Sequence, residues 1–237
     1  MQLFFAQIIH PNRAILLAEE ARHCIKVLRH AVGDEISCID GTGNMYQARI
    51  TSIDKTEVAV ELLTTHPNWG EPPIDITLAV SPLRLKDRFE WMMEKAVELG
   101  VSSIQPLRCQ HTDKYKAKFK PERIQTILKT ALKQCKRSRL PELKPEVPFA
   151  EWINGHSSEI SLMGWCEADQ PIQEFGAPIG NAKSVTLLIG PEGDFSPEEV
   201  KMAQDANWTP ISLGETRLRT ETAAVYALSA IKVFKAF

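Results

Sequence analysis

One stretch of the chain decides the fold: Leu187-Leu188-Ile189-Gly190-Pro191-Glu192-Gly193-Asp194-Phe195-Ser196-Pro197-Glu198-Glu199. An apolar run enters a loop that contains glycine and proline, and Ser196 and Pro197 follow this loop. Ser196 and Glu199 have the spacing of a capping box, and Pro197 would occupy the first helical position, where proline is favoured. The stretch therefore predicts a buried strand, then a loop whose glycines allow a ligand close to the backbone, then a helix.

The residues on both sides of this stretch repeat the alternation of strand and helix. Apolar patterns predict strands at 74–80, 103–107, 160–165, 185–189 and 210–213, and helices at 87–99, 121–137, 197–206 and 221–234. Strands that alternate with helices form mostly parallel α/β sheets, and such sheets bind ligands beyond the carboxyl ends of their strands. We therefore expect a ligand site at that edge of the sheet.

The beginning of the chain has shorter elements. Strands are expected at 35–39, 45–53 and 56–63, a turn at 41–44 and one helix at 19–30. Several short strands joined by tight turns suggest a small β-barrel. The Pro- and Gly-rich segment 66–73 then marks the boundary between a first domain at 1–70 and a second at 73–237.

The bulk composition indicates an ordinary globular chain. Of its 237 residues, 43% are hydrophobic and 24% are charged, and the length suits two domains. The start lacks the regions of a signal peptide, and no run of about 18 apolar residues could span a membrane. The five cysteines are widely spaced and include no Cys-x-x-Cys pair, which argues against structural zinc or a disulfide framework. We therefore expect a cytoplasmic protein that neither associates with a membrane nor binds a metal.

Positive charge is concentrated in one part of a chain whose net charge is −2. Residues 108–139 contain eleven Lys or Arg and only two acidic residues. A charge run is usually a solvated surface, but such a concentrated stripe favours binding to the phosphates of a nucleic acid. The expected RNA-binding residues are Lys114, Lys116, Lys129, Lys133, Lys136, Arg137 and Arg139.

A second strand-loop-helix segment runs from 211 to 224 and contains Gly214, Arg219, Thr220 and Glu221. Thr220 is expected to be the helix N-cap, and Glu221 suits the positive end of a helix. On these residues alone, capping with an ion pair between Arg219 and Glu221 is the favoured interpretation. A third segment, 134–142, is a basic helix end that Pro141 stops.

Together, these segments resemble the SPOUT methyltransferase superfamily and, within it, the ribosomal RNA small subunit methyltransferase E family. The resemblance covers nearly the whole chain and is carried by residues 94–101, 134–142, 188–193 and 213–223. It implies transfer of a methyl group from S-adenosyl-L-methionine to N3 of a uridine in 16S ribosomal RNA of the small subunit. It also implies an RNA-binding PUA-like barrel, a trefoil knot in the second domain, and a homodimer.

The resemblance implies a donor site built from the strand-end loops at 164–167, 190–194 and 213–222. Cofactor-binding residues would be Leu188, Ile189, Gly190, Pro191, Glu192, Gly193, Leu213, Gly214, Leu218, Arg219, Thr220 and Thr222. The family usually has Gly-Gly where this chain has Gly193-Asp194. Because Asp tolerates turn and left-handed conformations, we expect the loop to keep its shape.

The implied chemistry assigns roles to four side chains. N3 of uridine carries a proton at neutral pH, so the proton must leave and the resulting anion must be stabilised. Arg219, Arg137 and Arg139 are candidates for that electrostatic role, and Glu221 is a candidate proton acceptor. The sulfonium of the donor is already activated, so no metal is required.

Two other classes of function remain open on the sequence. The chain could be a non-catalytic RNA-binding protein of ribosome assembly, using the barrel and the basic stripe. It could also be a phosphotransferase that holds a nucleotide on the glycine loop, although it has neither a Walker A nor a G-x-G-x-x-G motif. The sequence leaves open which uridine is modified and whether free RNA or an assembled particle is the substrate.

Overall fold

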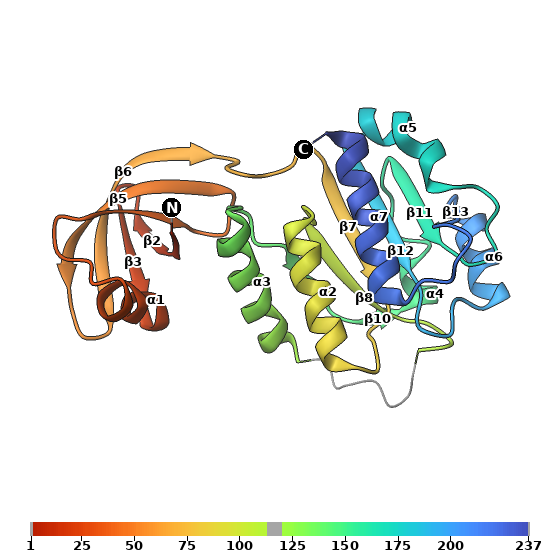
Figure 1. Ribbon diagram of the computed structural model, residues 1–237, viewed down its shortest axis with the longest axis horizontal. Helices are drawn as coiled ribbons and strands as arrows, with labels where there is room; N and C mark the ends of the chain where they lie inside the picture. The colour runs from red at the N-terminus through yellow and green to blue at the C-terminus, as the bar shows by residue number, and fades with distance from the viewer. Residues whose placement is uncertain (1, 113–119, 237) are drawn as a thin grey trace. The chain divides into compact units, whose positions relative to one another are not determined.

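The computed structural model describes residues 2–112 and 120–236 (Figure 1). The chain divides into two compact units. The first comprises Met1–Glu71 and Lys129–Leu140, and the second comprises Pro72–Leu128 and Pro141–Phe237. The division falls within helix α3 (Pro121–Cys135), so the first unit is discontinuous in sequence.

The first unit is built on a curled six-stranded sheet. Its elements are β1 (Leu3–Phe5), β2 (Gln7–His10), β3 (Arg13–Leu17), α1 (Ala18–Arg22), the π-helical turn η1 (His23–Val27), β4 (Glu35–Ile39), β5 (Asn44–Ile53) and β6 (Glu57–Pro67). The strand order is β1-β4-β5-β6-β3-β2, and every pair except β1 with β4 is antiparallel. Side chains such as Phe4, Leu16 and Ile50 fill its core. The expected small, barrel-like β unit is confirmed.

The helix expected at 19–30 differs from the observed one. The α-helical part, α1, ends at Arg22, and the chain continues as the π-helical turn η1 to Val27. Arg29 then has a φ of 59°, which is incompatible with a continued right-handed helix.

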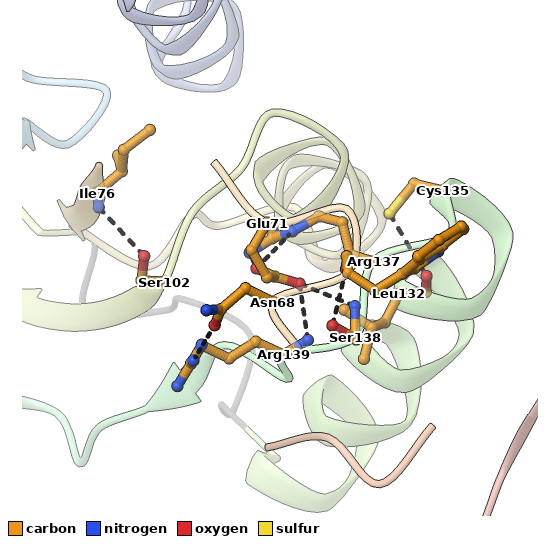
Figure 2. Close-up of polar contacts among 10 residues, drawn as sticks. Asn68, Glu71, Ile76, Ser102, Leu132, Cys135, Arg137, Ser138 and Arg139 are labelled. Carbon is orange, nitrogen blue, oxygen red and sulfur yellow. Dashed lines mark hydrogen bonds and ion pairs between the residues drawn. The ribbon is translucent and has the colours of Figure 1, made fainter. Parts of the chain in front are cut away.

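A buried ion pair ties the end of the linker to the segment after α3 within the first unit. Glu71 accepts hydrogen bonds from Nη2 of Arg137 at 2.7 Å and from the backbone N–H groups of Ser138 and Arg139, both at 2.8 Å. Figure 2 shows these three donors gathered around the Glu71 carboxylate. The side chains of Glu71 and Arg137 are only 7% and 5% exposed, so their mutual attraction offsets part of the cost of removing both charges from water.

The second unit contains a parallel sheet covered by helices. Its elements are β7 (Asp75–Val80), α2 (Lys86–Glu98), β8 (Ser103–Arg108), β9 (Glu142–Leu143), β10 (Val147–Pro148), α4 (Phe149–Trp152), β11 (Ile160–Gly164), η2 (Ile172–Phe175), α5 (Gly176–Asn181), β12 (Ser184–Ile189), α6 (Pro197–Asp205), β13 (Thr209–Ile211) and α7 (Thr220–Lys235). The order is β10-β8-β7-β12-β11-β13, with β9 beside β8, and every pair is parallel. The expected parallel α/β domain is confirmed.

The apolar strands of this sheet lie inside the unit because helices pack against it. β12 lies between β7 and β11, and its Val185, Leu187 and Leu188 have no exposed surface. Helix α7 contacts β12, α2 and α5, whereas α4 and α6 contact each other; Figure 1 shows α7 next to α2. The trefoil knot remains a prediction from the resemblance.

The described part of the chain has neither a membrane-spanning helix nor a cluster of metal-ligating side chains. Over residues 2–112 and 120–236, no helix is long and apolar enough to cross a membrane. The same residues contain no cluster of His, Cys, Asp or Glu suited to hold a metal ion.

The Glu71–Arg137 pair leads to a prediction about stability. Glu71→Ala would leave the Arg137 guanidinium buried without its carboxylate, so the free energy of unfolding should fall by about 3–5 kcal/mol. Urea denaturation measures this loss. Glu35→Ala is the matched control, because Glu35 pairs with Arg49 at the surface and should change stability by less than about 1 kcal/mol. Equal losses in both variants would contradict the prediction that breaking the buried pair costs more stability than breaking the exposed one.

Candidate functional site

A cavity of about 540 Å³ lies within the second unit, at the carboxyl ends of β11, β12 and β13. Three chain segments line it: 164–166 after β11, 189–192 with Asp194 after β12, and 212–221 with Ala223, which leads from β13 into α7. Arg88 of α2 completes the lining. The location agrees with the edge of a parallel sheet where ligands bind.

The loop after β12 is held in place by neighbouring segments. Glu192 accepts a hydrogen bond from the backbone N–H of Arg84, in the segment between β7 and α2, at 3.3 Å. Nδ1 of His111 lies 3.1 Å from the carbonyl oxygen of Gly193 and 3.0 Å from that of Asp194. Since a carbonyl oxygen only accepts hydrogen bonds, Nδ1 must carry the ring proton in these contacts.

Helix α6 fixes the far end of the same loop. Ser196 and Glu199 form the predicted capping box, with the Ser196 side chain accepting from the Glu199 N–H at 3.2 Å and the reverse contact at 3.0 Å. The other Glu199 oxygen accepts from the backbone N–H of Gln110 at 2.8 Å, which links α6 to the segment after β8. The loop therefore begins at the end of β12 and ends at the capped N-terminus of α6, which is itself bonded to the segment after β8.

The start of α7 brings charged side chains into the cavity. Glu221 is only 8% exposed, and its Oε1 accepts from Nη1 of Arg88 at 3.2 Å. Arg219 lines the cavity and is exposed. The expected roles of Thr220 and Arg219 are corrected here: the N-cap is Arg219, without a side-chain cap bond, and the ion pair that the structure records for Glu221 is with Arg88. Thr220 is instead the first helical residue, and it is buried.

Most of the predicted cofactor residues come together in this cavity. Those that line it are Ile189, Gly190, Pro191, Glu192, Leu213, Gly214, Leu218, Arg219 and Thr220, together with the proposed proton acceptor Glu221. Three others are not among its lining residues. Leu188 lies in the core, Gly193 packs against His111, and Thr222 is exposed on α7.

The other predicted site residues lie elsewhere. Arg137 and Arg139 belong to the first unit and do not line the cavity. The Arg137 side chain is only 5% exposed and pairs with Glu71 inside that unit. Arg139 is an exposed residue, and its Nη2 donates to Oδ1 of Asn68 at 3.2 Å.

The predicted RNA-binding lysines divide into three groups. Lys129 and Lys136 are exposed, and Nζ of Lys129 lies 5.3 Å from the centre of the Phe5 ring. Lys133 is half-buried and pairs with Glu20. Lys114 and Lys116 lie outside the described residues.

Arg88 lines the cavity from an element that the sequence did not assign to the site. It lies on α2, outside the apolar stripe of Phe89, Met92 and Met93. From the sequence, this position indicates only a polar residue on the helix surface. Its partner Glu221 follows 133 residues later in the chain. No local pattern connects two residues so far apart, and only the packing of α2 against α7 brings them together.

The Arg88–Glu221 pair should contribute measurably to stability. Arg88→Met removes the partner of a nearly buried carboxylate, while the Arg88 side chain is 39% exposed, so a loss of about 1 kcal/mol is expected. Adding Glu221→Gln should recover part of this loss, and a double-mutant cycle measures the coupling. The exposed pair of Arg49 and Glu35 is the control, with little coupling expected. A coupling no larger than that of the control would contradict the prediction.

Comparison with known proteins identifies the family. The RNA methyltransferase domain family matches residues 70–232, and the RNA methyltransferase PUA domain matches residues 16–63. The chain is 29% identical over 226 residues to the ribosomal RNA small subunit methyltransferase E of Bacillus subtilis, covering 91% of this chain and 88% of that one.

Solved structures agree with the sequence relatives. The ribosomal RNA small subunit methyltransferase E of Neisseria gonorrhoeae, bound to S-adenosyl methionine, is 28% identical with a TM-score of 0.85, covering 98% of this chain and 97% of that one. A probable rRNA-methyltransferase of Porphyromonas gingivalis is 32% identical with a TM-score of 0.86, covering 100% of this chain and 99% of that one. The chain therefore belongs to the RNA methyltransferase domain family, with a PUA domain at its N-terminal end.

Proposed function

We propose that this chain transfers the methyl group of S-adenosyl-L-methionine to N3 of a uridine in 16S ribosomal RNA of the small subunit. The observation that carries the proposal is the cavity at the carboxyl ends of β11, β12 and β13. It lies in a fold that matches a relative solved with S-adenosyl methionine at a TM-score of 0.85.

The residues of the cavity fit such a donor. The donor carries a positive sulfonium and ammonium, a negative carboxylate and a flat adenine. The lining offers the acidic Glu192, Asp194, Glu215 and Glu221, the basic Arg88, Arg217 and Arg219, and the apolar Ile189, Leu213 and Leu218. The volume of about 540 Å³ falls within the usual range for small-molecule sites, roughly 300–1,000 Å³.

The chain must then align the uridine with the donor and manage one proton. When bound, S-adenosyl-L-methionine supplies an activated methyl group. Holding N3 in line with that group accounts for much of the rate that a preorganised site can provide. The Arg219 guanidinium lines the cavity and can stabilise the anion that forms as N3 loses its proton.

Glu221 has two candidate roles. Its carboxylate lines the cavity, which suits a proton acceptor, but its contact with Arg88 also suits a purely structural role. The target uracil must also leave any stacked RNA helix to reach this cavity.

The proposed RNA partner would be bound by basic side chains outside the cavity. Lys129 and Lys136 are exposed and can contact phosphate, whereas Lys133 already neutralises Glu20. Lys114, Lys116, Arg137 and Arg139 are further candidates for phosphate contacts, because all four belong to the basic stripe at 108–139. A homodimer and a cytoplasmic location remain parts of the proposal, and the exposed Tyr226 and Val233 of α7 are apolar surface that a second copy could cover.

The function is tested with the purified chain, methyl-labelled donor, and 16S RNA presented either free or in small subunits. Label should enter the RNA, and mass mapping should locate it at N3 of a single uridine. Titration calorimetry separates the alternatives. Binding of ATP with magnesium in place of the methyl donor would favour a phosphotransferase. Binding of RNA without any donor affinity would favour a non-catalytic assembly protein.

Arg219 and Glu221 can be separated by single-turnover methylation. If Arg219 stabilises the uridine anion, Arg219→Ala should slow the reaction at saturating donor and RNA on the order of 100-fold or more. Arg219→Lys should recover only part of the rate, because an ammonium does not reproduce the guanidinium fork.

If Glu221 accepts the proton, Glu221→Gln should be slow at neutral pH and should recover in part as the pH rises, because hydroxide then removes the proton from uridine. If Glu221 only holds Arg88, the same variant should have a lower melting temperature and a nearly normal rate. A series of rates over pH, measured together with a melting curve, distinguishes these two results. A nearly normal rate with a lowered melting temperature would exclude Glu221 from the chemistry.

A further inference from the structure

Asp194 occupies a position where the backbone itself is unusual. Its φ is 63°, in the left-handed region that few residues other than glycine adopt without cost. Asp is one of the residues that tolerate this region, because its short side chain can bond to nearby backbone. The residue lines the cavity and is half-buried.

Both carboxylate oxygens of Asp194 accept backbone hydrogen bonds, and the two donors belong to different segments. Oδ1 accepts from the N–H of Phe195 at 2.9 Å, within the loop after β12. Oδ2 accepts from the N–H of Cys166 at 3.2 Å, in the loop after β11. One side chain therefore joins two of the segments that form the cavity.

The other contacts of the same loop lead away from the segment after β11. Glu192 bonds to the segment after β7, and His111 bonds to the loop from the segment after β8. The Asp194 carboxylate supplies the recorded hydrogen bond between the loop after β12 and Cys166. Changing it should alter the spacing of these two loops while leaving the other anchors in place.

We propose that Asp194 is a positioning residue of the donor site, whose carboxylate holds the loop after β12 against the loop after β11 and so sets the shape of the cavity. This inference rests on the proposed function, because it takes the cavity to be the site of the methyl donor.

Cys166 provides a readout that does not depend on activity. Its thiol lies on an exposed residue of the cavity lining, while Cys24, Cys38 and Cys109 are buried and Cys135 is half-buried. Burial, and next the Asp194 carboxylate, raise the pKa of the Cys166 thiol. Removing the negative charge of Asp194 should lower this pKa. Because the thiolate is the reactive form, alkylation at a pH below the pKa should then be faster.

Two variants remove the contact in different ways. Asp194→Asn keeps a residue that tolerates the left-handed region, but its amide has a single acceptor oxygen, so one of the two N–H groups loses its partner. Asp194→Gly removes both bonds and relieves the backbone cost, so it should fold. Asp205→Asn is the matched control, because Asp205 is exposed at the end of α6 and its replacement removes the same charge.

The experiment combines donor titration calorimetry, melting curves, and iodoacetamide labelling of Cys166 followed by peptide mass spectrometry. In both Asp194 variants we expect donor affinity to fall about 10- to 100-fold, the range for losing a hydrogen bond to a charged acceptor. Cys166 should label faster in both variants at pH 8, and bound donor should protect it less than in the unaltered chain. The melting temperature of Asp194→Gly should change little, and Asp205→Asn should match the unaltered chain throughout.

The outcomes separate this inference from the proposed function. An unaltered chain that binds no donor would overturn the proposed function and this inference with it. Donor binding by the unaltered chain together with undiminished affinity in Asp194→Gly would overturn the role of Asp194 alone. Weaker binding in proportion to a lower melting temperature in both variants would show general destabilisation, which also overturns it.

Discussion

The second unit depends on the parallel pairing of β12 between β7 and β11. Because every side chain from Val185 to Leu188 is nearly or completely buried, β12 can only run through the middle of the sheet. Parallel neighbours end at the same edge, so the loop after β12 must emerge between the loops that follow its neighbours. The cavity is a consequence of that crowding.

The same crowding explains why polar contacts, together with the buried Phe195 ring, fix this loop. Backbone N–H and C=O groups at a sheet edge need partners, and the side chains of Glu192, Asp194 and His111 provide them across three different strand ends. Gly190 has no side chain because a Cβ there would lie 2.9 Å from the Phe195 ring. A loop held at so many points is preorganised, which lowers the entropy that binding must overcome.

The sequence predicted the parts of the fold in which the local pattern and the tertiary role agree. Strand β12, the capping box of Ser196 and Glu199, and the cavity loops all follow from apolar runs with glycine and capping residues at their ends. The strands β1, β2 and β3 were not predicted, and β2 is largely exposed, so its side chains show no alternation of buried and exposed positions. The contacts of Arg88 with Glu221, and of Arg137 with Glu71, join residues more than sixty positions apart, and no local pattern encodes such partners.

The discontinuity of the first unit has a consequence for the order of events during synthesis. The carboxylate of Glu71 leaves the ribosome long before the guanidinium of Arg137, and until then it has to stay in water. The β-sheet of this unit can form early, but the unit is complete only when residues 129–140 have followed. A fragment that stops at Glu71 would therefore keep the strands and lose the buried neighbour of its last residue, so the shortest self-contained version of this unit cannot be obtained by simple truncation.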